Sequence, residues 1–177
     1  MMDDLKALIR TIPDFPKPGI MFRDVTTLMN DGAGFQKTIA ALTERYRGQR
    51  LDKIAGIEAR GFILGGAIAA ALGVGFVPLR KKGKLPGEAI GEDYALEYGT
   101  DRIEMHLGAV AAGERVLIVD DLIATGGTAE AAIRLIRAVH GEVVEACFVI
   151  DLPDLGGVKR LADLGCASFC LLAFEGH

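Results

Sequence analysis

Short runs of apolar residues alternate along the chain with stretches in which apolar residues recur at helical spacing. Phe35, Ile39, Leu42 and Tyr46 lie four, three and four residues apart, which predicts a helix with one apolar face. A short helix is also predicted near the start of the chain, and the remaining pattern predicts helices at 62–72, 129–139 and just before 168, and strands at 54–57, 75–79, 116–119, 143–150 and 168–174. Apolar strands that alternate with helices are typical of a parallel sheet covered on both faces. We therefore predict an α/β fold with a central, mostly parallel sheet and helices on both faces.

The segment 61–79, GFILGGAIAAALGVGFVPL, contains no charged residue and is just long enough to cross a bilayer. Gly73 and Gly75 interrupt it, however, and Pro78 lies near its end. A buried helix followed by a buried strand accounts better for this punctuation. We therefore expect no association with a membrane.

Two segments depart from the alternating pattern. IPDFPKPGIMFRD at 12–24 carries three prolines before a glycine, which predicts a stiff, extended loop. Within 80–107, Lys81–Gly91 is basic and rich in glycine, which predicts a mobile loop. The alternation of Tyr94, Leu96, Tyr98 with polar residues, and of Ile103, Met105, Leu107, predicts a β-hairpin that turns at 99–101. We predict a single domain over 1–177, with a hood at 1–34 and a flexible lid with its hairpin at 80–107.

Composition and charge limit the classes of partner. A net charge of −4 and a pI near 5.4 argue against binding to nucleic acid, although Arg80, Lys81, Lys82 and Lys84 form a local basic cluster suited to a small anion. Cys147, Cys166 and Cys170 have the pattern of buried thiols rather than of a metal site, which favours a reducing compartment. The first residues, MMDDLKALIR, lack the apolar core of a secretory signal.

The segment VLIVDDLIATGGT at 116–128 carries the strongest chemical signal. Four apolar residues lead into Asp120 and Asp121, and a loop of small residues, 124–128, opens the next helix. Gly126 and Gly127 allow a tight turn, so that the loop amides and the helix N-terminus can bind a phosphate. Thr125 and Thr128 add hydroxyl donors, and Thr128 can also cap the helix. The two acids suit the paired hydroxyls of a sugar, or a cation met directly or through water; the alternative is a solvated strand end beside an ordinary turn.

Ligands of parallel sheets bind at the carboxyl ends of the strands. In this chain the rule selects four segments: 58–61, 80–84, 120–128 and 151–157.

The segment 116–128 resembles the phosphoribosyl-diphosphate motif of the type I phosphoribosyltransferases. The resemblance implies that Ala124, Thr125, Gly126, Gly127 and Thr128 hold the 5′-phosphate of 5-phospho-α-D-ribose 1-diphosphate (PRPP). It also implies that Asp120 and Asp121 bind the ribose 2′- and 3′-hydroxyls. Mg²⁺ is the implied cofactor, held by PRPP and, at most, met by these two acids through water.

Further segments resemble the adenine phosphoribosyltransferases within that superfamily. In FPKPGIMFRD (15–24), the resemblance places Met21 at the adenine edge through its backbone and Arg23 beside the base; in IDLPDLGG (150–157), it places Leu152 on the purine face. Glu58-Ala59-Arg60-Gly61 resembles the diphosphate loop, with Arg60 on the diphosphate and a cis peptide at Glu58–Ala59. Each residue has a plainer alternative: a surface charge for Arg60, an ion-pair former for Arg23 and a core leucine for Leu152.

The lid resembles the same family in RKKGKLPGE (80–88) and YALEYG (94–99). We expect Arg80 and Lys84 to bind PRPP, with Arg80 acting in its own or the neighbouring subunit. Glu97 is expected to reach the base during transfer, and Tyr98 to help the lid settle. Glu97 as a polar hairpin residue is the alternative.

The resemblance implies an enzyme, a pentosyltransferase of purine salvage that converts adenine and PRPP to AMP and diphosphate. It also implies a cytoplasmic homodimer, with Glu97 and Arg60 as the catalytic residues. One alternative is transfer to another purine such as xanthine, hypoxanthine or guanine. An alternative of another class is a ligand-sensing regulator on the same fold, which would normally need an added DNA-binding part.

Overall fold

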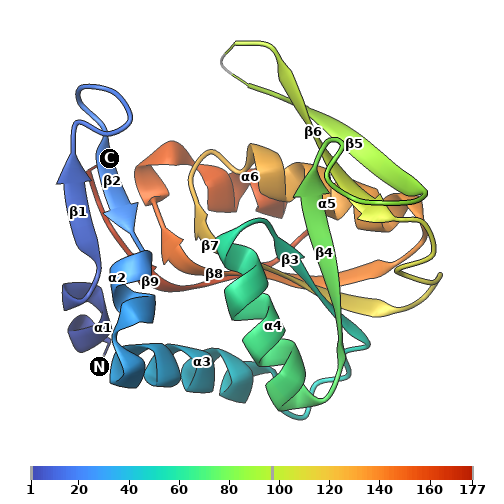
Figure 1. Cartoon of the computed structure of the whole chain (residues 1–177), viewed down its shortest axis with the longest axis horizontal. Helices are drawn as coiled ribbons and strands as arrows, with labels where there is room; N and C mark the ends of the chain where they lie inside the picture. Colours follow the sequence, from blue (N-terminus) through green and yellow to red (C-terminus); the bar gives the residue numbers. More distant parts are fainter. Residues whose placement is uncertain (1, 97, 177) are drawn as a thin grey trace.

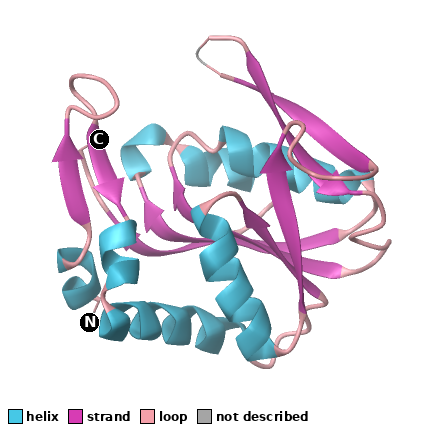
Figure 2. Ribbon diagram, viewed as in Figure 1, coloured by secondary structure: helices cyan, strands magenta, loops and turns pink. Residues whose placement is uncertain are grey.

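The computed structural model describes residues 2–96 and 98–176. Within these residues, the centre of the molecule is a seven-stranded sheet in the order β5-β6-β4-β3-β7-β8-β9 (Figures 1 and 2). The parallel part consists of β4 (Gly75–Lys81), β3 (Lys53–Ile57), β7 (Arg115–Ile123), β8 (Glu142–Asp151) and β9 (Ser168–Ala173). At one edge, β5 (Ala89–Ala95) and β6 (Thr100–His106) pair antiparallel, and β6 also pairs with the end of β4. The predicted fold class is confirmed.

Helices cover both faces of the sheet, and each face has its own apolar cluster. On one face lie α3 (Gly32–Tyr46) and α4 (Arg60–Leu72); on the other lie α5 (Gly127–Ala138) and α6 (Gly157–Asp163) (Figure 1). α4 approaches β7 closely, because a Cβ at Gly61 would lie 2.8 Å from the carbonyl oxygen of Val119. The absence of a side chain at Gly61 therefore lets the start of α4 rest on the strand that carries the two acids.

The N-terminal segment forms a small unit beside α3. It contains α1 (Asp3–Ala7), the antiparallel pair β1 (Arg10–Pro13) and β2 (Met21–Asp24), and α2 (Thr26–Asn30). The prediction of a loop throughout 12–24 is wrong at both ends, because the residues that flank the turn pair with each other, Ile12 with Phe22 for example. Only 14–20, which holds two of the three prolines, lies outside the strands.

β7 is longer than predicted. The apolar run ends at Val119, but the strand continues through Asp120 and Asp121 to Ile123. The strand continues because β8 runs alongside it: Asp120 pairs with Phe148, and Ile123 pairs with Asp151. The two acids therefore lie inside a hydrogen-bonded strand rather than after it.

The hairpin β5–β6 is confirmed, but its turn is misplaced by the prediction. Thr100 and Asp101 belong to β6 and pair with Ala95 and Tyr94, so the chain turns before residue 100. The predicted loop 81–91 is also too long, since Lys81 pairs with Ile103 of β6 and β5 begins at Ala89. The mobility of this loop stays a prediction.

In the described part of the chain, no helix is long and apolar enough to cross a membrane. The uncharged segment 61–79 divides, as predicted, into a helix and a strand.

Candidate active site

A cavity of about 290 Å³ lies where β7 ends and α5 begins. It contains eight of the predicted residues and five others: Arg60, Asp120, Asp121 and 124–128, together with Phe22, Leu122, Ile123, Ala129 and Phe148. The acids and the phosphate loop were predicted from one short motif, whereas Arg60 arrives from the start of α4. Of the four segments that the strand-end rule selected, 120–128 lines the cavity and 58–61 contributes Arg60, whereas 80–84 and 151–157 do not line it.

The loop 124–128 has the form of an anion site. Gly126 adopts a left-handed φ of +89° and occupies the N-cap position of α5. No amide of 125–128 donates a hydrogen bond to a backbone carbonyl among the described residues, so these N–H groups remain available. Together with the positive end of the α5 dipole they favour a phosphate. Capping by Thr128 is wrong, because Thr128 lies within the first turn of the helix and no side chain caps it.

Asp121 and Arg60 form an ion pair at the wall of the cavity. The Nε of Arg60 lies 2.5 Å from Oδ2 of Asp121, and the side chain of Asp121 is only 8% exposed. The hydrogen bond to Asp121 is the main reason why the pKa of Arg60 is raised. Arg60 is therefore paired at the wall of the cavity, and its contact with a diphosphate stays a prediction.

Asp120 faces a different environment. Its Oδ1 accepts a hydrogen bond from the amide of Asp121 at 2.8 Å, and Gly61 of α4 lies against its side chain. Burial raises the pKa of Asp120 well above its ordinary value, and the neighbouring charge of Asp121 raises it further. An ionised Asp120 is thus unfavourable in the folded, ligand-free protein.

We expect Asp120→Asn to stabilise the ligand-free protein while weakening its binding of PRPP. Between the ordinary and the raised pKa, the folded state binds more protons than the unfolded state, so this residue lowers stability as pH rises. The variant should gain about 1 kcal/mol in the free energy of unfolding at neutral pH, because asparagine keeps the oxygen that accepts from Asp121 without the charge.

Thermal unfolding of both proteins across pH tests this expectation. The advantage of the variant should shrink as pH falls towards the ordinary range of an aspartate. A variant that is less stable than the wild type at neutral pH would contradict it.

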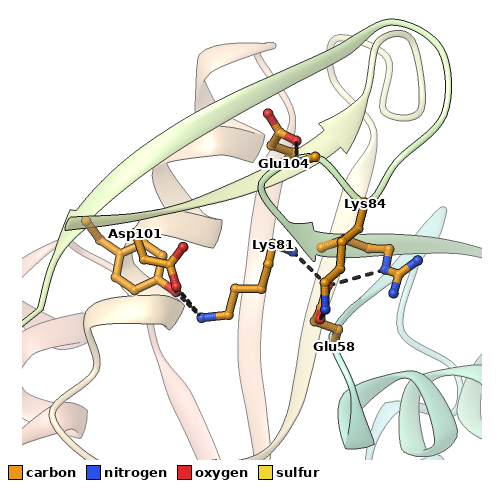
Figure 3. A network of polar contacts seen from close by, with 8 residues as sticks. Glu58, Lys81, Lys84, Asp101 and Glu104 are labelled. Carbon is orange, nitrogen blue, oxygen red and sulfur yellow. Dashed lines mark hydrogen bonds and ion pairs between the residues drawn. The ribbon is translucent and has the colours of Figure 1, made fainter.

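The basic residues of the predicted lid gather outside this cavity, around Glu58. Arg80 and Lys84 both form ion pairs with the Glu58 carboxylate (Figure 3). The peptide bond between Glu58 and Ala59 is cis, as the resemblance implied. Glu58 had no assigned role from the sequence, although an acid inside a predicted diphosphate loop was a signal for a counter-ion to nearby cations.

The three residues expected to contact the base do not line the cavity. Met21 is 37% exposed at the start of β2, and Leu152 is packed in the core at the beginning of the 3-10 turn η1 (Pro153–Leu155). Arg23 donates to Thr11 Oγ1 at 2.7 Å and to the carbonyl of Gly176 at 2.9 Å, with its guanidinium 4.8 Å from the ring centre of Phe174. Their contacts with a base stay predictions.

Phe22 was missed by the sequence reasoning. It lies between Met21 and Arg23 and does line the cavity. The β1–β2 pairing, which turns alternate residues to opposite sides, is the signal that would have found it.

Glu97, predicted to act on the base, lies outside the described residues. Its neighbour Tyr98 is 82% exposed at the hairpin tip, and Lys17 of the 14–20 loop lies 5.8 Å from the centre of its ring. The hood loop and the hairpin tip, which rise at the same end of the molecule in Figure 1, therefore approach each other.

Comparison with known proteins extends the similarity over almost the whole chain. The family model of the phosphoribosyl transferase domain matches residues 25–171. An adenine phosphoribosyltransferase from Nitrobacter winogradskyi is 59% identical over 99% of this chain and 98% of its own length. Another from Methylobacillus flagellatus is 60% identical over 97% of this chain and 98% of its own.

Solved structures of adenine phosphoribosyltransferases are also similar to this chain. That of adenine phosphoribosyltransferase from Rhodothermus marinus is similar at a TM-score of 0.92 and 51% identity, and covers 98% of each chain. The enzyme from Saccharomyces cerevisiae, complexed with an imino-altritol bisphosphate and adenine, is similar at a TM-score of 0.89 and 42% identity over 96% of this chain and 97% of its own. The similarity of fold therefore extends over nearly the whole chain.

Proposed function

Since the chain belongs to the adenine phosphoribosyltransferases of the phosphoribosyl transferase family, we propose that the cavity between β7 and α5 is where it performs that family's reaction. The enzyme converts adenine and PRPP to AMP and diphosphate, which is a step of purine salvage. One observation supports the assignment to this cavity: available loop amides, two carboxylates and a guanidinium all line it.

The sugar phosphate is proposed to bind across this cavity. The amides of 124–128 and the hydroxyls of Thr125 and Thr128 receive the 5′-phosphate. Asp120 and Asp121 accept hydrogen bonds from the 2′- and 3′-hydroxyls, and Arg60 lies beside them, where it can exchange Asp121 for the diphosphate. Arg80 and Lys84 add positive charge at Glu58, two residues before Arg60.

Departure of diphosphate leaves positive charge on the anomeric carbon and the ring oxygen. Carboxylates fixed by the strand stabilise that charge without reorganising, and the basic residues stabilise the anion that leaves. Met21, Arg23 and Leu152 are proposed to hold adenine, and Glu97 to manage a proton on the base. Closure of the hairpin over the hood would exclude water, which competes with the base as acceptor.

Mg²⁺ is the proposed cofactor, and the residues of the cavity fit it. Mg²⁺ usually keeps several waters and binds one or two carboxylates together with substrate phosphates. Asp120 and Asp121 supply carboxylates of that number, and PRPP supplies the phosphates. When bound, Mg²⁺ would neutralise charge on the diphosphate.

A cytoplasmic homodimer is the proposed setting. Cys147, Cys166 and Cys170 are free thiols, which suits a reducing compartment. An apolar groove of about 490 Å³ between α3 and α4 supports a second copy as the occupant of that face. Sedimentation velocity tests the assembly, and a monomer at all accessible concentrations would contradict it.

Turnover of labelled adenine with PRPP and Mg²⁺ tests the assigned site and base. We expect AMP to form, and an excess of hypoxanthine, guanine or xanthine to leave the rate almost unchanged. Consumption of another purine at a higher rate would overturn the choice of base. Salt-dependent binding to DNA without turnover would indicate a regulator.

A further inference from the structure

Glu58 binds three groups of the basic cluster at once. Its side chain is 10% exposed and follows directly after β3. Oε1 accepts a hydrogen bond from the amide of Lys81 at 2.7 Å and lies 3.3 Å from Nε of Arg80, while Oε2 accepts from Nζ of Lys84 at 3.0 Å. Figure 3 shows Lys84 reaching the carboxylate of Glu58, while the side chain of Lys81 extends away from it towards Asp101.

The carboxylate is held in its charged form. Burial alone would raise the pKa of Glu58, but the hydrogen bonds from the Lys81 amide and Lys84, and the charges of Lys84 and Arg80, bring it below the ordinary value. Arg80 and Lys84 repel each other when no anion lies between them. A charged Glu58 supplies that anion.

The cluster is anchored on its far side by the lid hairpin. Nζ of Lys81 donates to Oδ2 of Asp101 at 2.7 Å and lies 2.6 Å from the hydroxyl oxygen of Tyr94. In addition, Oε1 of Glu104 accepts from the amide of Gly83 at 2.9 Å. The backbone of 81–84 is therefore fixed both by Glu58 and by the hairpin, as Figure 3 shows.

Glu58 lies in the same short loop as Arg60, so its contacts with Arg80 and Lys84 are made close to Arg60. Arg60, two residues further along, begins α4 and pairs with Asp121 at the cavity. Arg80 and Lys84 are consequently held at the same loop that carries Arg60, although they come from the end of the neighbouring strand and beyond. Three cations are thus assembled around one short loop.

Building on the proposed function, we propose that Glu58 is a positioning residue for the diphosphate: its charge keeps Arg80 and Lys84 beside the Arg60 loop, ready for the anionic leaving group. Glu58 does not touch the sugar or the base in this scheme. It acts through the two cations, so its effect should fall on PRPP and diphosphate and not on adenine.

Glu58→Gln tests the charge without removing the side chain. Glutamine keeps an oxygen that can accept from the Lys81 amide but no longer attracts Arg80 and Lys84. We expect the affinity for diphosphate, measured by calorimetry with Mg²⁺, to fall about tenfold, which is roughly 1.4 kcal/mol. The KM for PRPP should rise by a similar factor, and the KM for adenine should change by less than about twofold.

Glu104→Gln is the matched control. Glu104 belongs to the same network and also accepts a backbone amide, but it pairs with Arg102 rather than with Arg80 or Lys84. Its replacement should leave diphosphate affinity and both KM values close to wild type. Equal losses in the two variants would overturn the proposal and indicate a structural role for the network.

The outcomes separate this inference from the proposed function. If the wild type forms AMP and Glu58→Gln binds diphosphate as tightly or more tightly, only the inference fails, and tighter binding would mean that Glu58 competes with the anion. A wild type that neither binds diphosphate nor forms AMP would remove the proposed function itself. Should Glu58→Gln not fold, Arg80→Gln and Lys84→Gln carry the test, because diphosphate affinity unchanged in both would overturn the proposal.

Discussion

Asp121→Asn is expected to lower kcat/KM for AMP formation by about 100- to 1,000-fold, or roughly 2.7 to 4 kcal/mol of transition-state stabilisation. Asp121 is only 6% exposed and lines the same cavity as the phosphate loop. Asparagine still accepts hydrogen bonds, but it lacks the charge that opposes the positive sugar. It also loses the charge-assisted bond that fixes Arg60.

Loss of stability should account for only a small part of this effect. The side chain of Arg60 is 41% exposed, so water partly replaces its lost partner. We expect the free energy of unfolding to fall by about 1 to 2 kcal/mol, the usual result of weakening one charged hydrogen bond. The folded fraction would then remain high, while the rate falls.

Steady-state kinetics and thermal unfolding, measured on the same preparations, check this expectation. Asp163→Asn is the control, since Asp163 is exposed and pairs, within the described part of the chain, with Lys159 one helical turn away. It should behave as the wild type in both measurements. An Asp121→Asn enzyme whose kcat/KM stays within about threefold of wild type would remove Asp121 from the catalytic machinery.

Local sequence was sufficient to predict which loop lines the cavity. The run 116–128 contains the buried strand, the acids and the glycine turn in one uninterrupted segment, and every residue from Asp120 to Thr128 lines the cavity. Such a motif needs few partners from elsewhere, because its strand, acids and turn follow one another along the chain and line the same space. The main strands and helices were also predictable from local sequence, because the spacing of apolar residues within each segment indicates its type.

Features that depend on a partner strand were not predictable from one segment. β7 continues past Val119 only because β8 remains beside it, and the prolines near Phe22 concealed the β1–β2 pairing. The turn of the lid hairpin was displaced because Thr100 and Asp101 find partners in β5. In each case hydrogen bonds to another strand outweigh the local signal.

Charged contacts across long sequence separations were also missed. Arg60 and Asp121 are 61 positions apart, and Glu58 meets Lys84 across 26. The resemblance named Arg60, Asp121 and Lys84 as ligand-binding residues, but it did not indicate that acids of the protein itself would hold the cations. A site that binds anions contains several cationic side chains. Acids of the protein must balance their charge while the ligand is absent.

Gly126→Val is expected to abolish most AMP formation, with a loss of about 100-fold or more in kcat/KM. Gly126 has a φ of +89°, which a β-branched residue rarely adopts. A Cβ there would lie 3.1 Å from Cα and 3.2 Å from the carbonyl oxygen of Gly157, so the loop must move away from α6. Because several amides of the loop are predicted to bind the same phosphate, even a small displacement would remove several hydrogen bonds at once.

Gly113→Val separates backbone strain from damage to the site. Gly113 has a φ of +82° and lies before β7, at the opposite end of that strand, with no atom within 4 Å of its added Cβ. Both substitutions should cost about 1 to 2 kcal/mol of stability through the left-handed backbone, but only Gly126→Val should raise the KM for PRPP. To compare the two variants, we would measure steady-state kinetics, varying first PRPP and then adenine, and thermal unfolding. If the two variants lost activity equally, the strain alone would explain the loss, and the loop 124–128 would no longer be required as the phosphate site.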